Sequence, residues 1–172
     1  MNPNGQPKTA TGSPEAAHQV LTFCLGAETY GVDIQRVQEL RGWLPVTRVP
    51  QSPPYVLGVL NLRGSIVPIV DLRVRFSLEQ AQFTPLTVIV VLSVMSSSGR
   101  REVGLVVDSV SDVVDIGADD LKETPSLGNT VTAKFISGIA TVAGRMLILL
   151  DVDELIRRDM EQVESPILAG AA

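Results

Sequence analysis

Two segments of this chain, residues 55–76 and 135–156, align without a gap at an offset of 80 residues. Apolar residues exchange with apolar residues along the alignment. Two glycines and an aspartate coincide: Gly58 with Gly138, Gly64 with Gly144, and Asp71 with Asp151. A second match, at an offset of 73, relates residues 31–34 to residues 104–107. Because a unit of about 65–75 residues buries little surface alone, we expect two copies that each close into a small antiparallel barrel and pack as one body.

The expected fold class is all-β, and the composition agrees with it. Apolar residues make up 45% of the chain while aromatic residues make up only 4%, so the core must be built from Val, Ile and Leu. β-Branched side chains suit the pleated, half-buried surface of a sheet. Short apolar runs bounded by turn residues place the strands and hairpins at 20–25, 30–33, 46–49, 55–71, 86–95, 102–108, 110–116 and 135–150.

Short helices and two tails complete the expected organisation. Residues 34–38 and 72–76 are expected to form helical turns, and residues 152–160 a C-terminal helix with Asp151 as its N-cap. The polar residues 1–18 predict a disordered tail, because they cannot bury enough apolar surface to offset the entropy of ordering. The expected domain covers residues 19–160, with one barrel over 19–84 and the other over 85–150, and it is followed by a frayed tail over 161–172.

The net charge and the cysteine content limit which partners the protein can have and in which cellular compartment it can lie. The net charge of −5 argues against nucleic acid as a partner, because phosphate binding needs a concentrated basic face. We find no signal peptide, and no apolar run approaches the ~20 residues of a membrane helix. The single cysteine, Cys24, fits a reducing compartment. We therefore expect a cytoplasmic protein with no direct membrane insertion.

The sequence lacks the residue combinations that are typical of enzymes. The only histidine, His18, falls in the predicted tail, so a His-based triad or metal cluster is not expected. Cys24 lies in a predicted strand and is interpreted as a small core residue. The glycine-rich nucleotide-binding motifs and the CxxC pair are absent. We expect a binding protein with no catalytic residue, no metal and no cofactor.

Two charged features are candidates for recognition. Glu39 and Arg41 share a face, beside the only tryptophan, if their backbone is extended. Arg63 lies in the predicted turn 61–64, which does not itself require arginine, because the repeat has Ala143 there. A guanidinium presented on a rigid turn suits a carboxylate partner, and Glu39 is an intramolecular candidate.

A third feature is an aliphatic set that includes Val37, Val106 and Val113. If the two barrels pack together, their junction forms a groove, and these side chains are placed to line it. Such a groove can receive an amphipathic helix. The alternative for each valine is an ordinary place in the core.

Longer motifs, in the same order, resemble the CheW-like domain family. Residues 25–42 match the family's opening, residues 47–50 and 58–73 its central signature, and residues 103–113 and 145–151 its second half. The resemblance implies two SH3-like five-stranded β-barrels with no catalytic activity. It also implies the family's partners, which are the cytoplasmic tip of methyl-accepting chemoreceptors and the regulatory domain of the histidine kinase CheA, assembled in membrane-associated receptor arrays.

The resemblance further implies which residues meet each partner. Four residues match family positions implicated in receptor binding: Val37, Glu39, Arg63 and Val113. Four others are assigned to the contact with the kinase. Gly58 matches a position linked to kinase and receptor binding, and Val46, Arg48 and Asn61 belong to segments, 46–49 and 61–64, that would lie near the barrel-to-barrel contact with the kinase. In this interpretation the protein is a non-catalytic adaptor that couples receptors to CheA in chemotaxis signalling.

Two other functions remain open. A CheW-like scaffold of a different chemosensory pathway, such as one for twitching motility or second-messenger control, would carry the same motifs. A small-molecule-binding barrel would need polar groups in its lumen, whereas the expected inward positions are nearly all aliphatic.

Overall fold

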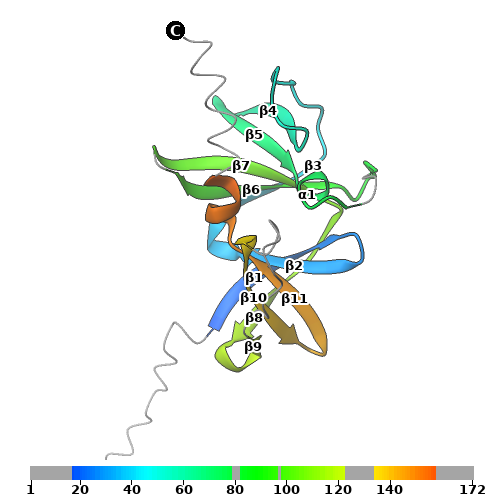
Figure 1. Ribbon diagram of the computed structural model, residues 1–172, viewed down its shortest axis with the longest axis vertical. Coiled ribbons are helices and arrows are strands. Elements are labelled where there is room, and N and C mark those ends of the chain that lie inside the picture. Colours follow the sequence, from blue (N-terminus) through cyan, green and yellow to red (C-terminus); the bar gives the residue numbers. More distant parts are fainter. Residues whose placement is uncertain (1–16, 79–81, 97, 123–133, 158–172) are drawn as a thin grey trace, which may run out of the picture.

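The computed structural model of the protein describes residues 17–78, 82–96, 98–122 and 134–157. These residues fold mostly into β-strands, with short helical turns between them (Figure 1). The strands are, in chain order, β1 (Ala17–Leu25), β2 (Glu28–Asp33), β3 (Val37–Gly42), β4 (Val56–Leu62), β5 (Ser65–Asp71), β6 (Val88–Ser96), β7 (Gly99–Val107), β8 (Ser109–Gly117), β9 (Leu121–Lys122), β10 (Ile136–Val142) and β11 (Arg145–Leu150). The helical elements are η1 (Ile34–Arg36), α1 (Leu72–Arg75), η2 (Ala118–Asp120) and residues 152–157.

The described strands form two sheets, and each sheet closes into a small barrel. The central barrel has the strand order β3-β6-β7-β5-β4, and the terminal barrel, built from both ends of the chain, has the order β8-β1-β2-β11-β10-β9. The central barrel closes where Thr47, after β3, bridges Val59 of β4. The terminal barrel closes through β9, which follows β8 and pairs with β10. The all-β, two-barrel fold class is confirmed, with parallel pairing confined to β5–β7 and β2–β11 among the described strands.

The internal repeat reappears strand for strand. Hairpins β4–β5 and β10–β11 occupy equivalent places in the two barrels, and both carry a register shift at the aligned glycines, Gly58 and Gly138. The backbone N–H groups of Asp71 and Asp151 each donate a 2.7 Å hydrogen bond to an aromatic residue's carbonyl, at equivalent positions. The first hairpin in each barrel, however, comes from the opposite copy: β6–β7 completes the central barrel and β1–β2 the terminal barrel. The two copies therefore exchange hairpins.

This exchange corrects the expected division into barrels over 19–84 and 85–150. The central barrel uses the strands between residues 37 and 107, so a boundary after residue 84 would divide it between β5 and β6. The physical reason is the parallel pairing of β7 with β5 and of β11 with β2. Each first hairpin pairs with the last strand of the other copy and not with that of its own.

Local expectations also differ from the structure. His18 lies in β1, paired with β8, and not in a tail. Residues 46–49 form an isolated bridge at Thr47 and not a strand, because Pro45 and Pro50 lack the N–H groups that a ladder needs. Three expected segments lie wholly or partly outside the described residues: the tail 1–18 except for its last two residues, the helix 152–160 beyond residue 157, and the tail 161–172.

The hydrophobic core has one part inside each barrel and one between the barrels. The largest part lies at the junction, where side chains of the β1–β2 hairpin pack with those of the β6–β7 hairpin, α1 and residues 152–157. Phe23, Leu92 and Leu155 are fully buried there. Smaller clusters fill the central barrel and the terminal barrel. The barrels therefore share a core, and Figure 1 shows them stacked as one body.

Candidate interaction surfaces

An ion cluster lies where β3 meets the turn between β4 and β5. Arg63 Nη2 lies 2.9 Å from Glu39 Oε1, and Arg41 Nε lies 3.3 Å from Glu39 Oε2. One carboxylate is thus held between two guanidinium groups, and the intramolecular partner expected for Arg63 is confirmed. The Arg63 side chain is 72% exposed. Because only one of its donors is engaged by Glu39, the other N–H groups of this guanidinium can bind a partner.

The valines expected to line a groove lie on strands of different barrels. Val37 opens β3 and is half-buried against the core of the junction. Val113 of β8 is 48% exposed and pairs with Leu21, which belongs to the same core. Val106 is fully buried inside the central barrel, so it is a core residue. The offset of 73 aligns Val113 with Leu40 of β3, which is 46% exposed and which the sequence interpretation missed.

The residues expected to face the kinase gather around the bridge that closes the central barrel. Val46 and Arg48 lie on either side of Thr47 in that bridge. Gly58 lies against it, since a Cβ there would approach the Thr47 carbonyl oxygen to 2.2 Å. Asn61 lies further along β4, where its side chain accepts a 2.9 Å hydrogen bond from a backbone N–H of the turn. The exposed Arg48 also lines a cavity of about 250 Å³ with the proline-containing loop that follows it.

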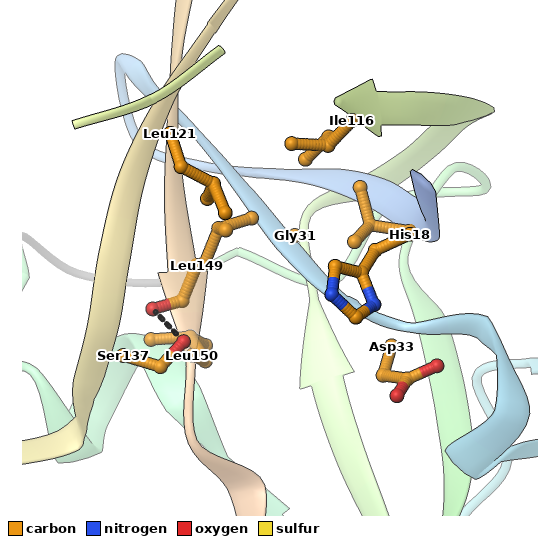
Figure 2. Close-up of a pocket in the computed structure, with 9 residues that line it drawn as sticks. His18, Gly31, Asp33, Ile116, Leu121, Ser137, Leu149 and Leu150 are labelled. Carbon is orange, nitrogen blue, oxygen red and sulfur yellow. Dashed lines mark hydrogen bonds between the residues drawn. The ribbon is translucent and has the colours of Figure 1, made fainter. Parts of the chain in front are cut away.

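A second cavity of about 250 Å³ lies in the terminal barrel (Figure 2). Its lining is mostly apolar, as Ile116, Leu121 and Leu149 illustrate, while His18 and Asp33 contribute polar groups on one side. Within the part of the chain that the structure describes, no group of three or more His, Cys, Asp or Glu side chains is placed to hold a metal ion.

Cys24 is half-buried and is not the core residue that the strand pattern predicts. Its side chain lies on the opposite face of β1 from the junction core, and its Sγ lies 3.7 Å from the hydroxyl oxygen of Ser111 on β8.

Among the described residues, Arg73 and Asp71 carry buried charges, each 2% exposed, and no role was predicted for Arg73 from the sequence. Its Nε and Nη2 donate to the two carboxylate oxygens of Asp71 at 3.0 and 3.1 Å. Its Nη1 donates to Asp108 Oδ1 at 3.1 Å and to the carbonyl of Gln82 at 2.8 Å. The guanidinium also lies 4.9 Å from the ring centroid of Phe83. Burial by itself lowers the pKa of Arg73, but the hydrogen bonds and negative charges of both aspartates outweigh burial and raise it, so the side chain stays charged.

Comparison with known proteins decides the family. The family model of the CheW-like domain matches residues 19–160. The chain belongs to the CheW-like domain family. The chemotaxis protein CheW of Klebsiella aerogenes is 43% identical to it over 138 residues, which cover 80% of this chain and 81% of that one. The chemotaxis protein CheW of Rhizobium meliloti is 39% identical over 137 residues, which cover 80% and 86% of the two chains.

A solved structure agrees with this assignment. The scaffolding protein CheW of Thermoanaerobacter tengcongensis matches with a TM-score of 0.71 at 30% identity, over 78% of this chain and 88% of that one. Protein FrzA of Myxococcus xanthus is 28% identical over 151 residues, which cover 86% and 89% of the chains. Members of this family are non-catalytic scaffolds or adaptors, and this protein is one of them. Among the described residues, no helix has the length and apolar character needed to span a membrane.

Proposed function

We propose that this CheW-like adaptor couples the cytoplasmic tip of methyl-accepting chemoreceptors to the regulatory domain of the histidine kinase CheA. It acts in the cytoplasm and is recruited to membrane-associated receptor arrays. The observation that carries the proposal is the extent of the family match, which spans residues 19–160 and so includes both barrels and the residues that join them. A non-catalytic protein of this kind works through its surfaces, and each partner needs its own.

The receptor surface in this proposal includes Val37, Glu39, Arg63 and Val113. Val37 and Val113 offer apolar area beside the junction core, with Val113 48% exposed. Arg63 offers a solvent-exposed guanidinium whose position is set by Glu39. Apolar anchors beside an oriented charge suit an amphipathic helix that carries a carboxylate.

The kinase surface in this proposal includes Val46, Arg48, Gly58 and Asn61. These residues lie beside the closing bridge of the central barrel or in β4, the strand that the bridge contacts. The surface combines an exposed cation, Arg48, with a backbone that Gly58 and Asn61 hold in a defined shape.

The test measures both affinities by calorimetry, using a receptor tip and the CheA regulatory domain. We expect each wild-type Kd to be about micromolar, as is typical of small interfaces. Val113→Glu should weaken receptor binding more than about tenfold, because it places a charge in apolar contact, and should leave kinase binding unchanged. Arg48→Glu should do the reverse. Arg100→Ala, at the exposed end of β7, is the control and should leave both affinities unchanged.

Either of two results would overturn the proposal. One is a folded wild-type protein that binds neither partner. The other is a set of variants in which both affinities always change together, since the two partners would then not have separate surfaces.

A second candidate is a CheW-like scaffold of a different chemosensory pathway, and the similarity to protein FrzA favours it. Co-purification from the native cell discriminates between the two candidates. Recovery of chemotaxis receptors with CheA supports the first, and recovery of receptors and a kinase from another pathway supports the second.

A further inference from the structure

The repeat places Arg73 and Asp153 at equivalent positions, since residues 73 and 153 are related by the offset of 80. Each is the second residue after the aspartate that caps its helix. In the structure each side chain reaches a segment where the chain crosses from one barrel to the other. These crossing segments are η1, between β2 and β3, and Asp108, between β7 and β8.

The contact made by Arg73 is buried on the side of the arginine only. The Arg73 side chain is 2% exposed, that of Asp108 is 37% exposed, and Arg73 Nη1 lies 3.1 Å from Asp108 Oδ1. The other carboxylate oxygen of Asp108 accepts a 2.8 Å hydrogen bond from the N–H of Gly26, in the β1–β2 turn of the terminal barrel. This contact, here called the buried clamp, joins a helix of the central barrel to the terminal barrel. Arg73 is also held by both carboxylate oxygens of Asp71, and because breaking that buried, hydrogen-bonded charge pair is costly, the arginine of the buried clamp is fixed in place.

The contact made by Asp153 has the opposite arrangement of charges and is accessible to water. Asp153 Oδ2 accepts a 2.6 Å hydrogen bond from Arg36 Nη2, and its Oδ1 accepts a 3.0 Å bond from the N–H of Met95 on β6. Arg36 Nη1 also lies 3.5 Å from the carbonyl of Ser93. The Arg36 and Asp153 side chains are 34% and 33% exposed. This contact, here called the exposed clamp, ties residues 152–157 to η1 and β6. Solvent reaches and screens both of its charged groups, whereas in the buried clamp it reaches only the aspartate.

The exposed clamp lies next to the proposed receptor surface. Arg36 is followed directly by Val37, whose backbone N–H donates to the carbonyl of Ile34 and closes the single turn of η1. We propose that Arg36 and Asp153 are positioning residues, whose ion pair fixes η1 and the start of β3 so that Val37 and Glu39 can meet the receptor. The inference rests on the proposed function of those two residues. The buried clamp, whose arginine is also paired with Asp71, holds the other crossing segment.

The test uses variants that remove a charge while keeping volume, in the full chain. Asp153→Asn retains an oxygen for the N–H of Met95 but loses the charge that attracts Arg36, and Arg36→Gln removes the other partner. Glu154→Gln is the matched control, because Glu154 pairs with Arg157 within the same helix. Calorimetry gives the affinities for the receptor tip and the CheA regulatory domain, and amide exchange by NMR reports on the N–H of Val37.

We expect Asp153→Asn and Arg36→Gln each to weaken receptor binding about fivefold and to speed exchange of the Val37 amide about fivefold, as befits an exposed ion pair. Kinase affinity should stay within about twofold. The double variant should bind the receptor no more weakly than either single variant, because the two residues act through one contact. Glu154→Gln should match the wild type in all three measurements.

Unchanged exchange at Val37 together with unchanged receptor affinity would overturn the inference. So would a parallel loss of both affinities with a lower unfolding temperature, since that pattern indicates a merely structural contact. If the wild type binds neither partner, it is the proposed function that fails. The exchange of the Val37 amide then still decides whether the exposed clamp positions η1.

Discussion

Gly58 holds the central barrel closed at a place where a side chain has no room. Its φ is +152°, and a Cβ would lie 2.2 Å from the carbonyl oxygen of Thr47 and 2.7 Å from its carbonyl carbon. At the equivalent position of the other copy, Gly138 has a comparable register shift, but the nearest atom to a Cβ there is Leu121 Cδ2 at 4.0 Å. The same residue type at aligned positions is therefore required at one and tolerated at the other.

We predict that Gly58→Ala lowers the free energy of unfolding by about 2–3 kcal/mol, because the Thr47 carbonyl must move and the bridge to β4 must distort. Gly138→Ala should change it by less than about 1 kcal/mol. Urea unfolding followed by the fluorescence of Trp43, the single tryptophan, measures both variants. Equal losses would contradict the steric explanation.

The burial of Tyr30 makes the stability of the protein depend on pH in the alkaline range. Its ring is buried between Phe23 and Phe76, with centroid distances of 6.0 and 5.8 Å. Burial first, and the negative charge of Glu28 second, raise the pKa of its phenol above the ordinary value. The unfolded chain therefore ionises at lower pH than the folded one, so this contribution to stability is complete below about pH 10 and is lost as the pH rises further.

The variant Tyr30→Phe removes the titrating group and keeps the stacked ring. Between about pH 9 and pH 11 its Tm should fall less steeply than that of the wild type. Thermal unfolding at a series of pH values provides the comparison. If the two curves fall in parallel, another group accounts for the alkaline loss.

At the scale of elements, hairpins β4–β5 and β10–β11 show that their turns require a particular backbone conformation but not a particular side chain. Arg63 and Ala143 have nearly the same φ, 54° and 52°, and each precedes a glycine with positive φ. The backbone geometry is thus shared, while the guanidinium is peculiar to the first hairpin. A side chain that the element does not need, and that lies 72% exposed beside Glu39, is available for binding.

We predict that Arg63→Ala changes the free energy of unfolding by less than about 1 kcal/mol, because an ion pair with so exposed an arginine contributes little. Receptor binding should weaken about tenfold, since a charge-assisted hydrogen bond is lost. Denaturant midpoints and calorimetry measure the two quantities. A large loss of stability would show that the turn needs arginine, and an unchanged affinity would remove Arg63 from the receptor surface.

At the scale of the whole molecule, the exchange of hairpins makes the two halves of the chain depend on each other. We predict that neither fragment 1–84 nor fragment 85–172 folds alone, because each would expose its half of the junction core and leave both barrels incomplete. Mixing the fragments should restore a folded complex. Circular dichroism and size-exclusion chromatography follow both steps, and independent folding of either fragment would contradict the exchange.

Much of this fold could be predicted because its signals are local. Alternating apolar residues, turn residues and the aspartates before the helices mark the elements wherever the copies lie in space. The self-alignment predicted two equivalent units. It also predicted that the turn at 61–64 does not require Arg63, because the repeat has Ala143 at that position. The pairing of Glu39 with Arg63 followed from opposite charge alone and is confirmed at 2.9 Å. The roles of the eight proposed contact residues stay predictions.

By itself the sequence determined a duplicated, aliphatic, all-β chain whose motifs place it in one adaptor family. Only the tertiary structure decided how the copies combine and which distant residues meet. The exchange of hairpins, the contact of the buried Arg73 with Asp108, and the pairing of Arg36 with Asp153 are of this second kind. The physical reason is that aliphatic strands fit beside either copy equally well, so the apolar pattern specifies strands but not their neighbours. The charged contacts at the crossings depend on that choice of neighbour, and they exist only once it has been made.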